Sequence, residues 1–130
     1  MIGLDTNVLI RYLVRDDQLQ YERARRLLRR AVEGREPVMV SLLTLLEMEG
    51  VLRSRYVLSK EDIAATISSL LDARELTFED EPSIEEAMHL WKDSATDFAD
   101  CLIDARNRRL GCRTTVTFDR KALLTGFSQV

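Results

Sequence analysis

Several carboxylates in this chain occupy positions where an ordinary surface acid is not expected. Asp5 directly follows an apolar opening, and Glu47 and Glu49 are the only charged residues between Val38 and Leu52. A carboxylate in a nearly apolar helix is costly unless a cation or hydrogen bonds compensate it. Two ordinary explanations stay open: Asp5 is also a good helix N-cap, and the glutamates could mark a narrow solvent-facing stripe.

A second group of acids lies near the C-terminus. Asp97, Asp100 and Asp104 have the spacing i, i+3 and i+7, which places them along one face of a helix, where like charges repel. Asp97 and Asp100 would also suit the N-terminal end of a helix dipole, whereas Asp104 is too far along to benefit. Asp119 follows a Thr- and Val-rich segment. Spacing alone does not rank these acids.

The chemistry available to these acids is that of a hard cation. His89 is the only histidine, and Cys101 and Cys112 are the only cysteines, so the chain offers no zinc site of the usual Cys and His type. Clustered carboxylates raise one another's pKa unless a cation is present, and oxygen ligands suit magnesium or manganese. Such a site can activate water and neutralise charge during phosphodiester cleavage.

The bulk composition predicts a single domain, residues 1–130, of a cytoplasmic protein. The chain has 130 residues, of which 45% are hydrophobic and 32% charged. We expect no signal peptide and no membrane span, because no apolar stretch is long enough. The net charge of −3 argues against a nucleic-acid partner, but eight arginines fall between Arg11 and Arg35. Phosphates respond to such a patch rather than to the net charge.

Short apolar strands alternating with helices predict an α/β fold with a mostly parallel sheet. In such sheets the ligand crevice lies at the carboxyl ends of the strands, where we expect both Asp5 and Asp119. The predicted strands are Met1–Leu4, Val38–Val40, Leu76–Phe78 and Arg113–Thr117. The predicted helices are Val8–Val14, Gln18–Val32, Leu42–Arg53, Ser59 to about Ala73, Glu85–Lys92, and Thr96 or Asp97 to about Leu110.

Four segments of the chain resemble the acidic motifs of the PIN-domain nucleases, especially the VapC-type toxins of type II toxin–antitoxin pairs. The segments are Ile2–Leu9, Val40–Leu52, Asp97–Ile103 and Val116–Asp119. Each is nonspecific alone, but their order and spacing are characteristic. Cys101 replaces the usual alanine, and Asp104 is not usual. The alignment favours Glu47 over Glu49.

The resemblance implies a three-layer α/β/α sandwich and a magnesium-dependent endoribonuclease, with manganese as a possible substitute. Asp5 and Asp100 would be the main metal ligands, and Glu47 and Asp119 would complete the catalytic acids. Asp97, Thr6, Asn7 and Thr117 would support the site. A homodimer and a cognate antitoxin are also implied. Arg11 and Arg15 are candidate RNA contacts, although the same arginines could dock the antitoxin.

Other functions remain open at this level. The chain could be a housekeeping PIN nuclease in RNA processing, or a non-catalytic RNA- or protein-binding module whose acids only cap helices. Phosphotransfer domains also place an aspartate after the first strand. The haloacid dehalogenase type expects a second aspartate at position 7, which is Asn7 here. The receiver type expects a central phosphoacceptor and a later lysine, for which no clear candidates occur. The sequence does not name the RNA target, although single-stranded or looped RNA is expected.

Overall fold

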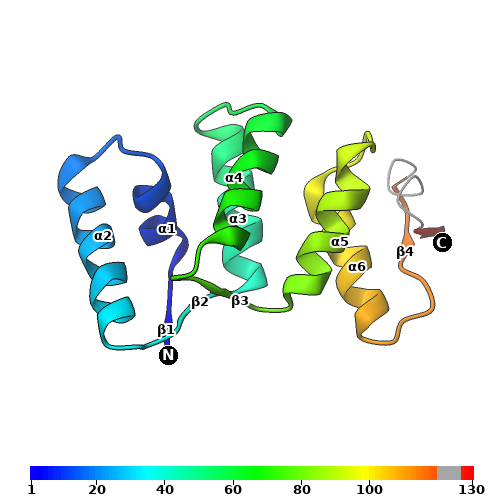
Figure 1. The fold of residues 1–130 in the computed structure, drawn as a ribbon. Helices are drawn as coiled ribbons and strands as arrows, with labels where there is room; N and C mark the ends of the chain where they lie inside the picture. The colour runs from blue at the N-terminus through cyan, green and yellow to red at the C-terminus, as the bar shows by residue number, and fades with distance from the viewer. Residues whose placement is uncertain (120–126) are drawn as a thin grey trace. The chain divides into compact units, whose positions relative to one another are not determined.

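The computed structural model describes residues 1–119 and 127–130 and divides the chain into two compact units, Met1–Glu79 and Asp80–Val130 (Figure 1). Both units combine helices with short strands. All the strand pairs are parallel among the described residues. The α/β class with parallel strands that the sequence predicted is therefore confirmed.

The first unit is built on a three-stranded parallel sheet in the order β1-β2-β3. The strands are β1 (Ile2–Gly3), β2 (Val38–Val40) and β3 (Thr77–Phe78). Ile2 pairs with Val38, and Val40 pairs with Phe78. Because side chains alternate along a strand, Val38, Val40 and Phe78 share one face, where they are buried. This sheet brings the residues after each strand to one edge.

Four helices belong to this unit: α1 (Thr6–Leu13), α2 (Gln18–Glu33), α3 (Leu42–Ser54) and α4 (Lys60–Asp72). Three of them begin at a side chain that caps the helix. Asp17, Ser41 and Ser59 accept hydrogen bonds from the backbone N–H of Gln20, Thr44 and Asp62, respectively. These bonds satisfy otherwise unpaired donors of the first turn. Helices α3 and α4 therefore begin within one residue of the predicted starts.

The described residues of the second unit form a helical pair, α5 (Glu81–Lys92) and α6 (Phe98–Arg109), and the parallel strands β4 (Val116–Thr117) and β5 (Ser128–Gln129). Trp91 and Phe98 meet edge to face with ring centroids 5.1 Å apart, a favourable aromatic geometry. Gly111 has a φ of +98° just after α6, which a glycine adopts without strain. It ends the helix where the sequence predicted.

The structure differs from the sequence prediction at several elements. Helix α1 begins at Thr6 rather than Val8, and strand β4 covers Val116–Thr117 rather than Arg113–Thr117. Helix α5 begins at Glu81 rather than Glu85, because Asp80 caps it and Pro82 lies in its first turn, where proline needs no N–H partner. Strand β5 was not predicted, since Ser128 and Gln129 have no strand pattern and pair only through β4. No helix in the described part of the chain is long and apolar enough to cross a membrane.

Candidate metal-dependent active site

Asp5 lies at the carboxyl edge of the first unit's sheet, between β1 and α1. It occupies the N-cap position of α1 with extended backbone angles, yet its side chain makes no capping hydrogen bond among the described residues. The carboxylate is exposed, whereas the neighbouring Thr6 is buried. The structure therefore does not support helix capping as the role of the Asp5 side chain.

Helix α3 is anchored beside the residue that precedes Asp5. The Thr44 hydroxyl donates a hydrogen bond of 3.2 Å to the carbonyl of Leu4. Glu47 lies one turn further along α3 and is exposed, so it is on the same helix face as Thr44. The first unit thus brings the start of α3, with Glu47 one turn in, toward the chain segment that carries Asp5.

Glu49 has a different environment from Glu47. Its side chain is only 4% exposed, and its Oε2 accepts a 3.0 Å hydrogen bond from Nε of Arg53, one turn later on α3. A buried carboxylate needs such a partner. The contrast agrees with the motif alignment that selected Glu47, because Glu49 is already engaged within its own helix.

Glu79 is a further acid at this sheet edge that sequence reasoning missed. It follows β3, and its Oε1 accepts a hydrogen bond of 2.9 Å from the backbone N–H of Leu42 at the start of α3. A negative charge there complements the helix dipole. Position 79 lies at the end of a predicted strand, as Asp5 does, and that placement was the available signal.

The second unit brings Asp97, Asp100 and Asp119 near one another. Asp100, in the first turn of α6, is half-buried. Burial, followed by the charges of Asp97 and Asp119, raises the pKa of Asp100 above its ordinary value. Asp97 is at the N-cap position of α6 but makes no capping hydrogen bond among the described residues. These acids repel one another, which a bound cation would relieve.

Asp104 differs from Asp97 and Asp100 because its carboxylate is bound by other side chains among the described residues. Its Oδ2 pairs with Arg108 at 2.9 Å, and its Oδ1 accepts a hydrogen bond of 3.3 Å from the Thr115 hydroxyl. Asn107 also donates to Thr115, at 3.0 Å. Asp104 is 2% exposed. This network ties α6 to the segment that leads into β4, so Asp104 has a structural role.

Thr117 supports the turn that carries Asp119. Its hydroxyl accepts a hydrogen bond of 3.0 Å from the backbone N–H of Asp119. Asp119 follows β4 directly and is exposed. Thr117 therefore holds the backbone of Asp119, and its supporting role at the site stays a prediction.

The donor set in each unit fits a hard divalent cation. In the part of the chain that the structure describes, no three His, Cys, Asp or Glu side chains form a group that could hold a metal ion. Magnesium, however, usually takes one or two carboxylates and completes its shell with water and substrate phosphate. Asp5 belongs to the first unit, and Asp100 to the second. The assembly of the four acids into one site stays a prediction.

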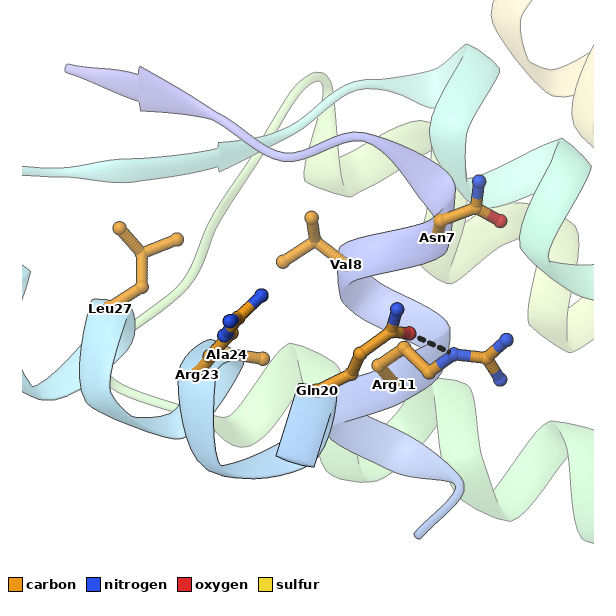
Figure 2. Close-up of a pocket in the computed structure, with 7 residues that line it drawn as sticks. All are labelled: Asn7, Val8, Arg11, Gln20, Arg23, Ala24 and Leu27. Carbon is orange, nitrogen blue, oxygen red and sulfur yellow. Dashed lines mark hydrogen bonds between the residues drawn. The ribbon is translucent and has the colours of Figure 1, made fainter. Parts of the chain in front are cut away.

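The two arginines predicted to contact RNA have partners within the first unit. Arg11 donates from Nε to Gln20 at 2.6 Å and from Nη1 to Asp16 at 3.0 Å and to the Tyr56 hydroxyl at 3.1 Å. The guanidinium of Arg15 lies over the Tyr21 ring, 4.5 Å from its centroid, within cation–π distance. Asn7 is exposed and lines a pocket between α1 and α2 (Figure 2).

Comparison with known proteins covers nearly the whole chain. The sequence model of the PIN domain matches residues 2–127. The chain is 26% identical over 127 residues to a VapC ribonuclease from Aquifex aeolicus (strain VF5), covering 98% of this chain and 93% of that protein. All four predicted acids lie within the matched range.

Proposed function

The chain belongs to the PIN-domain family, and from that premise we propose that it is a divalent-metal-dependent endoribonuclease. Asp100 carries the proposal. Its pKa is raised by burial and by two neighbouring aspartates, and it accepts no hydrogen bond or ion pair from any described residue. A carboxylate that the fold leaves uncompensated is a good ligand for a cation.

The proposed roles follow from the position of each acid. Asp5 and Asp100 would hold magnesium or manganese, and Glu47 and Asp119 would complete the set, directly or through water. The bound ion would supply a more acidic water and neutralise charge on the phosphate. Thr117 holds the backbone of Asp119, and Asp97 adds negative charge beside Asp100. We expect one domain formed by residues 1–130.

A cleavage assay on purified protein tests this proposal. Wild type should cut single-stranded RNA with magnesium or manganese and stop with EDTA. Asp5→Asn should lower the rate at least about a hundredfold, beyond the usual effect of an outer-shell partner. Asp17→Asn is the matched control, since Asp17 is also an N-cap but does bond its helix. Full metal-dependent cleavage by Asp5→Asn would refute the site assignment.

The proposal extends to a toxin of a toxin–antitoxin pair, because the chain resembles a VapC ribonuclease over nearly its full length. A small antitoxin-like reading frame immediately upstream would support it over a housekeeping role in RNA processing. Expression of the wild type should arrest bacterial growth, and Asp100→Asn should not. Co-expression of the upstream product should restore growth. A homodimer is part of the same proposal and is tested by light scattering.

A non-catalytic binding module is the alternative from another class. Isothermal titration with manganese separates the two, because acids that only cap helices should not bind the ion. Absence of both metal binding and cleavage would favour the binding module.

A further inference from the structure

A pocket of about 290 Å³ opens between α1 and α2 in the first unit, close to the lower limit of typical small-ligand sites. Figure 2 shows residues of α2 facing residues of α1 across it. Val8, Ala24 and Leu27 provide apolar surface, and Asn7, Gln20 and Arg23 provide polar groups. Asn7 is two residues after Asp5, so the pocket borders the helix that begins at a candidate metal ligand.

The hydrogen bonds around the pocket decide which polar groups can meet a ligand. Gln20 accepts from Arg11 through Oε1 at 2.6 Å (Figure 2), which leaves its amide nitrogen to donate. The Arg11 guanidinium is also held by Asp16 and Tyr56. Arg23 is exposed and has no ion pair or hydrogen bond among the described residues. The pocket therefore presents donors beside an apolar wall.

Charge favours an anionic ligand here. Helix α2 carries five arginines and two glutamates, although the whole chain has a net charge of −3. One glutamate, Glu22, pairs with Arg25 at 3.5 Å. A local excess of arginine attracts phosphate even when the net charge is negative.

We propose that this pocket binds one unpaired base of single-stranded RNA, with Arg23 on an adjacent phosphate. The inference rests on the proposed ribonuclease function and adds a nucleotide subsite to it. Val8 and Leu27 contact the face of the base, and the Gln20 amide donates to a base carbonyl. Proteins read single-stranded RNA through such unstacked bases, combining face contacts with hydrogen bonds to base edges.

Binding of labelled RNA to the full chain tests the subsite. The probes are a fluorescein-labelled 12-nucleotide RNA of random sequence and an abasic ribose-phosphate of the same length, both in EDTA. Leu27→Trp fills the pocket and should weaken binding of the base-containing RNA roughly tenfold, as loss of one base contact does. It should leave the abasic probe unaffected. Leu19→Trp is the matched control, because Leu19 is exposed on the same helix but does not line the pocket.

Two further variants keep the test decisive if Leu27→Trp unfolds. Gln20→Glu retains the acceptor for Arg11 but replaces the amide donor, and it should weaken binding of the base-containing RNA more than that of the abasic probe. Arg23→Gln should weaken both probes more than Arg26→Gln does and lower the salt slope by roughly 0.7. If the folded pocket variants bind RNA as well as their controls do, the subsite is overturned. A protein partner would then be the alternative occupant of the pocket.

Cleavage measured separately distinguishes this inference from the proposed function. If manganese supports cleavage but the pocket variants bind RNA as well as their controls do, only the subsite is contradicted. Pocket-dependent binding without any cleavage would contradict the nuclease and keep the subsite.

Discussion

Helices α5 and α6 of the second unit both begin at an aspartate, and the two aspartates have opposite environments. Asp80, at the start of α5, accepts hydrogen bonds from Ser83, Arg106 and Arg109. Asp97, at the start of α6, makes no capping hydrogen bond among the described residues and instead lies near Asp100. The same residue type at the same helix position thus caps its helix in one case and makes no capping bond among the described residues in the other.

The pKa values follow this difference. Burial raises the pKa of Asp80, but hydrogen bonds from Ser83 and the charges of Arg109 and Arg106 outweigh burial and lower the pKa below its ordinary value. Burial and two like charges raise the pKa of Asp100. The fold thus satisfies one acid with donors and places the other beside further acids, which is the environment that the proposed cation would compensate.

The largest effect should come from Asp100→Asn, with Asp104→Asn as its counterpart on the same helix. Asp100→Asn should reduce RNA cleavage at least about a hundredfold and leave the melting temperature equal or higher, since it removes repulsion. Asp104→Asn weakens the bonds to Arg108 and Thr115 and should lower the melting temperature. Cleavage rates and thermal melts of both variants check the pair; the reverse pattern would exchange their roles.

Removal of the satisfied cap should mainly affect stability. Asp80→Ala deletes the N-cap bond and both arginine pairs, and should cost about 2 kcal/mol in the free energy of unfolding. Urea titration measures that loss. Lys92→Ala, on the exposed end of the same helix, is the control and should change stability little. An Asp80→Ala variant as stable as Lys92→Ala would show that the cap contributes nothing measurable.

Acid should remove the same stabilisation in the wild type. The pKa of Asp80 is lower in the folded than in the unfolded chain, so its stabilisation is complete above the unfolded value and is lost as the pH falls through the folded value. We therefore expect the stability difference between wild type and Asp80→Asn to shrink steadily below about pH 4. Urea titrations at several pH values measure it, and a difference that stays constant down to pH 2 would contradict the assignment.

The smallest effect should come from Asp97→Ala. Loss of a bonded aspartate cap usually costs about 1 kcal/mol, but Asp97 makes no such bond and repels Asp100. We expect a stability change within about 0.5 kcal/mol, as for a surface substitution. The pKa of Asp100 should fall toward its ordinary value, which carboxyl NMR titration follows. A stability loss as large as that of Asp80→Ala would show that Asp97 is a cap after all.

Local patterns were enough to locate most elements, whereas the resemblance to the PIN-domain nucleases selected the acids. The capping residues Ser41 and Ser59 and the terminating Gly111 act on their immediate neighbours, so their effects can be read within a few residues. The start of α5 was placed too late although its signals are also local: Asp80 caps the helix through Ser83, and Pro82 lies in the first turn. The ion pairs of Asp80 with Arg106 and Arg109, more than twenty residues away, could not be read from the sequence. Strand β5 escaped prediction for a different reason, since pairing with β4 is what makes Ser128 and Gln129 a strand.

The sequence identified the candidate carboxylates, but tertiary structure decided the environment of each one. Residue type and spacing identified a larger set of acids as candidates for a hard-metal site, and the resemblance to the PIN-domain nucleases selected Asp5, Glu47, Asp100 and Asp119 among them. Residue type and spacing did not separate the capping Asp80 from Asp97, which makes no capping hydrogen bond among the described residues. Tertiary contacts made that distinction by giving donors to Asp80 and Asp104 and by placing Asp97 and Asp119 near Asp100. The charge state of a carboxylate depends on the groups that surround it in space, and those come from distant parts of the sequence.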